Sequence, residues 1–254
     1  MKGEGEIRDA VVLLAGAGSR LLGARGAIPK PLVPVLGRPL IAHILRALDG
    51  VGVRSVHGVV GAGADDVISG IADCLPPPMT FNRIDNRQWQ LQNGVSVLAA
   101  APAVDRPFLL VMGDHLFEPA ILRRLIDDAD RRRLTLAVDR KVGGIFDLAD
   151  ATKVCTEGRR IVSISKNLAT YDAIDTGVFL CSPELFDYLE RAKVRGDCSL
   201  SDGVQLMAND GKAEATDIED AWWQDVDTPA MLQRAEESLP DSLRLTADAP
   251  LAGG

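Results

Sequence analysis

The 254-residue chain contains no apolar run long enough to span a membrane, and residues 1–9 are charged rather than apolar as in a secretory signal. Its four cysteines are far apart, form no Cys-x-x-Cys pair and have no histidine at metal-ligand spacing. No block of basic residues stands out, and the formal net charge is −8. These absences argue against a membrane-embedded protein, a secreted disulfide scaffold, a structural zinc site and a nucleic-acid-binding protein. We therefore expect a cytoplasmic protein with free thiols.

The remaining composition is ordinary for a globular protein, with 46% apolar and 25% charged residues. Strand-like segments at residues 10–14, 55–60 and 107–112 alternate with helical segments that begin at Pro39 and Pro119. This alternation predicts an α/β fold: a single Rossmann-like three-layer domain with a mixed, mostly parallel sheet.

We expect this domain to span residues 1–240, followed by a flexible tail at residues 241–254. The alternation changes between residues 142 and 176, where short β-like pieces at 151–156 and 160–165 are separated by a glycine turn. This change predicts a small β-hairpin insertion that covers the functional site.

A run of small residues directly follows the first predicted strand and consists of Leu14, Ala15, Gly16, Ala17, Gly18 and Ser19. Such a run frees backbone N–H groups to bind an anion, and glycine lets phosphate oxygens approach the main chain. Arg20 and Lys30 bring positive charge to the same turn. The pattern predicts a loop that binds a nucleoside triphosphate.

Two other phosphate-binding patterns do not fit this loop. The dinucleotide fingerprint needs a third glycine where Leu21 stands, and the P-loop needs Gly-Lys-Ser/Thr where Lys30 lies between two prolines. The glycines taken alone also fit an ordinary turn between a strand and a helix.

Candidate acidic residues lie after the predicted strand at 107–112 and before the last predicted helix. Asp114 follows that strand, where α/β sheets present ligand-contacting residues, although a turn or helix cap also fits it. Asp225 and Asp227 precede the helix start at Pro229, and Asp227 would also complement the dipole of that helix. A triphosphate-binding enzyme needs Mg²⁺, which takes one or two carboxylates plus phosphate oxygens.

The glycine loop, closed by Pro29-Lys30-Pro31-Leu32, resembles the signature of nucleotidyltransferases that join a nucleoside triphosphate to a phosphorylated sugar or alcohol. This group is the nucleoside-diphospho-sugar pyrophosphorylase superfamily. The resemblance implies that the loop wraps the triphosphate and that Arg20 and Lys30 neutralise it. It also implies that Asp114 and Asp225 together hold one Mg²⁺, with Asp227 as a weaker third ligand.

The same resemblance assigns the residues that recognise the two substrates. Asn93, Gly94 and Ser96 would contact the nucleobase, although Asn-Gly is also a common turn. Lys166 would bind the acceptor phosphate and position its attacking oxygen, although it also fits a surface lysine in a hairpin. The other residues assigned to the acceptor pocket are Tyr171, Asp175, Thr176 and Gly177.

Taken together, these motifs look most like inositol-1-phosphate cytidylyltransferases over residues 9 to about 238. The resemblance implies that CTP and inositol 1-phosphate react to give a CDP-linked product and pyrophosphate. A sugar 1-phosphate, phosphocholine or a phosphonate stays open as the acceptor. Many relatives are fused to a membrane phosphotransferase, so a separate membrane enzyme is expected to use the product here, and a homo-oligomer is possible.

Two functions of other classes also stay open. Asp225-Val226-Asp227 matches the Asp-x-Asp motif of metal-dependent glycosyltransferases, but those enzymes lack a glycine loop closed by Pro-Lys. A non-catalytic nucleotide-binding subunit is the second alternative, and the joint presence of Arg20, Lys30 and Asp114 argues against it.

Overall fold

The computed structural model describes residues 6–16, 28–61 and 63–244 of the chain. In chain order its elements are β1 (Asp9–Leu13), η1 (Lys30–Leu32), β2 (Pro34–Val35), β3 (Arg38–Pro39), α2 (Leu40–Asp49), β4 (Ser55–Val60), α3 (Ala64–Ala72), β5 (Thr80–Asp85), α4 (Asn93–Ala99), η2 (Ala101–Ala103), β6 (Phe108–Met112), β7 (His115–Phe117), α5 (Pro119–Asp128), β8 (Leu134–Asp139), η3 (Val142–Gly144), β9 (Lys153–Glu157), β10 (Arg160–Ser165), β11 (Ala173–Cys181), α6 (Glu184–Ala192), α7 (Leu200–Asn209), β12 (Ala213–Asp217), β13 (Trp223–Asp225) and α8 (Pro229–Ser238).

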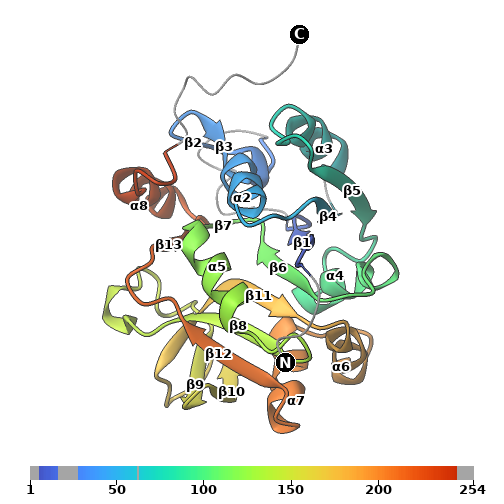
Figure 1. Cartoon of the computed structure of the whole chain (residues 1–254), viewed down its shortest axis with the longest axis vertical. Coiled ribbons are helices and arrows are strands. Elements are labelled where there is room, and N and C mark those ends of the chain that lie inside the picture. The colour runs from blue at the N-terminus through green and yellow to red at the C-terminus, as the bar shows by residue number, and fades with distance from the viewer. Residues whose placement is uncertain (1–5, 17–27, 62, 245–254) are drawn as a thin grey trace.

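In the described part of the chain, nine strands form the central sheet, in the order β5-β4-β1-β6-β11-β8-β12-β10-β9 (Figure 1). Strands β5, β4, β1 and β6 pair in parallel, and so do β8 and β12. Strands β11 and β10 run against their neighbours. The predicted mixed, mostly parallel sheet is therefore confirmed.

Helices cover both faces of this sheet, which gives the three predicted layers (Figure 1). One apolar core lies between the sheet and α2, α3, α5 and α8, and a second lies between the sheet and α4, α6 and α7. In β6 the side chains of Leu109 and Val111 enter the first core, whereas those of Phe108 and Leu110 enter the second. A strand buried on both faces needs a continuous apolar run, which explains why this segment was recognisable in the sequence.

The predicted hairpin insertion is present as β9 and β10, but it belongs to the main sheet. Strand β9 pairs with β10 and also with β11, while β10 pairs with β12. Strand β11 accordingly begins at Ala173, inside the segment predicted as insertion. Its first residues lie between β8 and β9, so their pairing partners are distant in sequence and local pattern could not reveal them.

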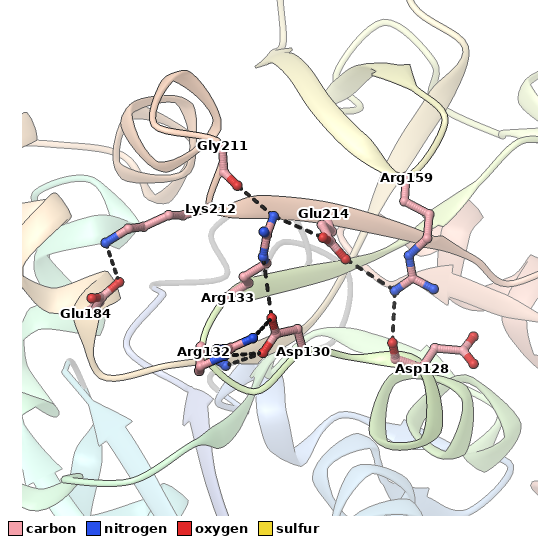
Figure 2. Close-up of polar contacts among 9 residues, drawn as sticks. All are labelled: Asp128, Asp130, Arg132, Arg133, Arg159, Glu184, Gly211, Lys212 and Glu214. Carbon is pink, nitrogen blue, oxygen red and sulfur yellow. Dashed lines mark hydrogen bonds and ion pairs between the residues drawn. The ribbon is translucent and has the colours of Figure 1, made fainter. Parts of the chain in front are cut away.

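A network of ion pairs joins the amino ends of β8 and β12, opposite the carboxyl ends of β1 and β6. Arg133 donates to the Gly211 carbonyl at 2.7 Å and pairs with Glu214 at 3.1 Å, and Glu214 also pairs with Arg159 at 3.4 Å (Figure 2). Asp130 pairs with Arg133 at 3.5 Å. These contacts tie the turn between β9 and β10 to the sheet.

The packed chain continues past the predicted domain end at residue 240. Leu243 is buried, and its carbonyl accepts a hydrogen bond from Nδ1 of His43 in α2 at 3.3 Å. The packed chain therefore extends to Leu243, past the predicted boundary, and the remainder of the predicted tail, 245–254, lies outside the described residues.

The four cysteines are free thiols, as expected. In the described part of the chain, no helix combines the length and the apolar character that crossing a bilayer requires.

Gly94 offers a test of the contact between α4 and the start of α7. A Cβ at this position would lie 2.6 Å from the Cys198 carbonyl oxygen, which is backbone and cannot easily move. Alanine stabilises a helix by about 1 kcal/mol relative to glycine, but the clash with the carbonyl outweighs this gain. We expect Gly94→Ala to lower the free energy of unfolding by about 1–3 kcal/mol. Gly143→Ala is the matched control, because nothing lies within 4 Å of its added Cβ. Equal urea-unfolding curves for the two variants would contradict this packing argument.

Candidate active site

The first part of the site forms where β1 and β6 end side by side. Leu13 pairs with Met112, and the Gly113 N–H donates to the Leu13 carbonyl at 3.0 Å. A Cβ on Gly113 would lie 2.4 Å from that carbonyl oxygen, so glycine permits the close approach. This contact places Asp114 beside the start of the predicted glycine loop.

Only the first residues of that loop can be described. Leu14 and Ala15 are buried, and the Leu14 N–H donates to the Val59 carbonyl at 2.8 Å. Gly16 is exposed. The remaining predicted nucleotide-binding residues of the loop, Ala17, Gly18, Ser19 and Arg20, lie outside the described residues.

Lys30 is the cation that joins the two halves of the site. It begins η1, is 8% exposed, and its Nζ donates to Oδ2 of Asp114 at 2.6 Å and to Oδ1 of Asp227. Burial alone would lower the pKa of Lys30, but the charges of Asp114 and Asp227 outweigh burial and raise that pKa. Lys30 therefore stays charged in a buried position between two carboxylates.

A short two-stranded ribbon, β7 with β13, brings the predicted metal ligands together (Figure 1). Asp225 is the pairing partner of His115, and the Val226 N–H donates to the Asp114 carbonyl at 2.9 Å. Asp114 and Asp225, far apart in sequence, thus occupy neighbouring positions on paired segments. The sequence did not predict this ribbon, because each strand is only three residues long.

The two aspartates have opposite electrostatic environments. Burial alone would raise the pKa of Asp114, but the charges of Lys30 and His115 outweigh it and lower that pKa to about 2. Burial raises the pKa of Asp225, and the negative charges of Asp227 and Asp114 raise it further. The charge of His115 lowers it, but not enough to reverse the shift. Asp225 also accepts a hydrogen bond at 2.9 Å from Nε2 of Gln224. A further cation near Asp225 would relieve this repulsion between carboxylates.

The donor set fits a hard divalent cation. Mg²⁺ prefers oxygen ligands and needs only one or two carboxylates, because phosphate oxygens and waters complete its shell. Asp114 and Asp225 supply that number. Across the described residues, no three His, Cys, Asp or Glu side chains converge into a complete metal site. Asp227, like Asp114, contacts Lys30, and the role of all three aspartates as metal ligands stays a prediction.

His115 packs at the centre of this acidic group. Its Nδ1 donates to the Thr176 carbonyl at 2.7 Å, and its Nε2 lies 3.5 Å from Oδ1 of Asp114. A Cβ on Gly177 would lie 2.3 Å from Nδ1, so this close packing requires glycine there. Burial alone would lower the pKa of His115, but Asp114 and Asp225 outweigh it and raise that pKa.

A cavity of about 250 Å³ opens from these residues toward the β9–β10 hairpin. The residues assigned from sequence that line it are Asn93, Asp114, Lys166, Asp175, Gly177, Asp225 and Asp227. Lys166 Nζ donates to Oδ1 of Asp150 at 2.6 Å on the cavity wall. The cavity therefore joins the predicted metal ligands to the predicted acceptor residues, and it is also lined by the 145–152 segment and by Lys166, which directly follows β10.

Two predicted acceptor residues do not present their side chains to this cavity. Thr176 has no exposed surface, and its hydroxyl donates to the Ala137 carbonyl at 2.8 Å on the other side of the sheet. Tyr171 is not among the lining residues, and the adjacent Asp172 carboxylate accepts a hydrogen bond from the Thr156 hydroxyl at 2.6 Å. Thr176 alternates in direction with Asp175 and Gly177 along β11, and Tyr171 lies in the segment between β10 and β11, so their roles in the acceptor pocket stay predictions.

The predicted nucleobase residues have structural contacts of their own. Oδ1 of Asn93 accepts the Leu200 N–H at 2.8 Å, and the buried Ser96 hydroxyl accepts a hydrogen bond from Asn86 at 2.9 Å. Gly94 packs against the Cys198 carbonyl. Contact of these residues with a base stays a prediction, and among the three only Asn93 lines the cavity.

The sequence reasoning missed several residues that the fold brings to the site. Asp147 and Asp150 line the cavity from the segment before β9, while His115 and Trp223 lie around Asp114 and Asp225. Local sequence carries a signal only for His115 and Trp223, which adjoin the motifs already identified. Asp147 and Asp150 lie in irregular chain, where no periodicity indicates the direction of a side chain.

Comparison with known proteins agrees with this geometry. Residues 10–203 match the family model for the MobA-like NTP transferase domain. The chain is 34% identical over 230 residues to a bifunctional IPC transferase and DIPP synthase of Rubrobacter xylanophilus, an alignment that covers 90% of this chain and 51% of the relative. It is 33% identical over 244 residues to the CMP-5'-(3-aminopropyl)phosphonate synthase of Streptomyces rubellomurinus, which covers 89% of this chain and 38% of that protein.

Among solved structures, the inositol-1-phosphate CTP transferase from T. maritima is similar with a TM-score of 0.83 and 28% identity. The match covers 92% of this chain and 96% of that one. The chain spans about half the length of the bifunctional relatives that it matches. The resemblance to nucleotidyltransferases inferred from the sequence is confirmed.

Asp175 allows a test of the cavity's electrostatics through stability. Burial raises the pKa of Asp175 to about 6, although the hydrogen bond from the Gly177 N–H and the charge of His115 both lower it. The pKa of an aspartate in the unfolded chain is about 3.9, so the folded state binds the proton of Asp175 more tightly than the unfolded state does. The free energy of unfolding therefore falls as the pH rises from about 4 to 6. We expect Asp175→Asn to raise the free energy of unfolding by about 2 kcal/mol at pH 8 and very little at pH 4. A gain that is the same at both pH values in urea unfolding would contradict this assignment.

Proposed function

The chain belongs to the family of MobA-like NTP transferase domains, and we propose that it is a Mg²⁺-dependent cytidylyltransferase that joins CTP to inositol 1-phosphate and releases pyrophosphate. The nucleotidyltransferase class follows from the family. The choice of CTP and inositol 1-phosphate is supported by the similarity to the inositol-1-phosphate CTP transferase from T. maritima over 92% of this chain.

One observation carries the proposal: Lys30 contacts Asp114 and Asp227 at the point where β7 and β13 bring Asp225 alongside. Lys30, which closes the predicted phosphate loop, therefore lies with the predicted acidic residues. A triphosphate that enters from the glycine loop would bring its phosphates to Lys30 and to the carboxylate pair.

The proposed reaction needs no protein nucleophile and no general base. The acceptor phosphate is largely ionised at neutral pH, since its second pKa is about 6. One of its oxygens attacks the α-phosphorus of the triphosphate, the bond to the bridging oxygen breaks, and pyrophosphate leaves with that oxygen. The enzyme's task is to align two polyanions and to stabilise the charge that develops between them.

Each described residue has a defined part in this task. Lys30 neutralises the triphosphate, and Asp114 and Asp225 would hold Mg²⁺, which when bound supplies further positive charge at the phosphates. Lys166 exchanges Asp150 for the acceptor phosphate and orients its attacking oxygen. Asp175 accepts hydrogen bonds from acceptor hydroxyls at the same wall of the cavity.

A phosphonate is the second candidate acceptor. It is favoured by the 33% identity to the CMP-5'-(3-aminopropyl)phosphonate synthase. We also predict a cytoplasmic location, a homo-oligomeric state and a membrane phosphotransferase that uses the product.

A substrate panel tests the function directly. CTP, UTP, GTP and dTTP are each combined with inositol 1-phosphate, glucose 1-phosphate, phosphocholine or 3-aminopropylphosphonate, and pyrophosphate release is measured with Mg²⁺ present. We expect the highest kcat/KM for CTP with inositol 1-phosphate, and a loss of about a hundredfold or more in Asp114→Asn, Asp225→Asn and Lys30→Ala. Absence of pyrophosphate with every pair, or near-normal rates in the three variants, would refute the proposal.

The role of Lys166 is tested by separating the two substrates. Lys166→Ala should raise the KM for the acceptor phosphate by about tenfold and change the KM for CTP little, because the lost charge faces only the acceptor. Lys212→Ala is the matched control, since Lys212 also forms a surface ion pair, with Glu184 at 2.9 Å, at the opposite end of the sheet (Figure 2). A larger effect on the KM for CTP would remove Lys166 from the acceptor pocket.

A further inference from the structure

Asp139 is a buried carboxylate that has no part in the reaction described above. It ends β8, is 4% exposed, and accepts hydrogen bonds from the Lys141 N–H at 2.7 Å and from Nε1 of Trp223 at 2.9 Å. The Lys141 ammonium also pairs with it at 2.9 Å. Burying a carboxylate costs free energy unless such contacts replace water. Asp139 therefore depends on these donors, and the Trp223 indole depends on Asp139 for its hydrogen bond.

Trp223 borders two cavities. It lines the catalytic cavity of about 250 Å³ and also a second cavity of about 330 Å³, which Asp139, Trp222 and Arg234 line as well. A close-packed interior fixes a side chain through contact on all sides. Trp223 lacks such contact where it borders the cavities, so the indole N–H bond to Asp139 fixes the ring.

The Trp223 ring lies next to the acidic residues. Its ring centroid lies 5.8 Å from that of His115, and His115 is the pairing partner of Asp225. Trp223 and Asp225 are two residues apart in β13, so their side chains leave the same face of the strand. His115 also lies 3.5 Å from Asp114. A continuous set of contacts thus leads from Asp139 to both predicted ligands.

We propose that Asp139 is a positioning residue, which holds the Trp223 ring and through it sets His115, Asp114 and Asp225 in the arrangement that binds the divalent cation. This inference rests on the proposed function, because it takes Asp114 and Asp225 as the ligands. Asp139 acts through Trp223 and touches neither ligand. Groups that bond a metal ligand directly change metal affinity by about 10–100-fold when removed, so an effect at the lower end, about tenfold, is expected for a residue that acts through Trp223.

The test measures Mn²⁺ binding to the full chain in the presence of CTP, without acceptor, by electron paramagnetic resonance of the free ion. The variants are Trp223→Phe, which keeps an aromatic ring but removes the N–H, Asp139→Asn, and the two combined. Trp222→Phe is the matched control, since Trp222 lines the second cavity but not the catalytic one. Asp225→Asn reports on the ligand assignment, and thermal unfolding of every variant reports on folding.

We expect Trp223→Phe and Asp139→Asn each to raise the Kd for Mn²⁺ by about tenfold. The Kd of the double variant should be no higher than that of the weaker-binding single variant, because both changes break the same hydrogen bond. Trp222→Phe should leave the Kd unchanged. If Trp223→Phe keeps its Mn²⁺ affinity while Asp225→Asn loses it, the positioning role is overturned and the metal assignment stands. Multiplying effects in the double variant would overturn the coupling between the two residues. No loss in Asp225→Asn would instead refute the metal assignment, and so the proposed function.

Discussion

The site depends on one buried cation, the ammonium of Lys30, which contacts the carboxylates of Asp114 and Asp227. These three residues come from η1, from the turn after β6 and from the approach to α8, so a single charge connects three distant parts of the chain. Charges interact more strongly in a poorly solvated interior than in water. Removal of one partner from such a group leaves the others buried and uncompensated. Lys30 therefore holds these three parts of the site together.

The β7–β13 ribbon supplies the second constraint. It lies outside the main sheet and pairs Asp225 with His115, and it brings the Asp114 carbonyl to the Val226 N–H. Backbone hydrogen bonds thereby fix two carboxylates next to each other, where their charges repel. Burial raises the pKa of Asp225, and the charges of Asp227 and Asp114 raise it further. The fold, supported by cores on both faces of the sheet, holds this pair in a position that favours a bound cation.

The sequence was a good guide to the fold and to the strand ends. The segments at 55–60 and 107–112 were recognisable because strands buried on both faces carry uninterrupted apolar runs. The start of β11 and both strands of the ribbon were missed, because they are short and are stabilised by partners distant in sequence. Thr176 shows the limit for side chains: it follows Asp175 directly, yet its hydroxyl bonds to Ala137 on the other side of the sheet.

The sequence by itself determined the α/β architecture and the nucleotidyltransferase family, and it predicted a phosphate-binding loop closed by Lys30 and an acidic pair of Asp114 and Asp225. These features reside in periodicity and in local motifs, which the chain carries without folding. Only the tertiary structure decided that Lys30 meets Asp114 and Asp227, that Asp150 pairs with Lys166, and that Asp139 holds Trp223. The physical reason is that such contacts depend on strand order and side-chain direction, which are set when distant segments pack against one another.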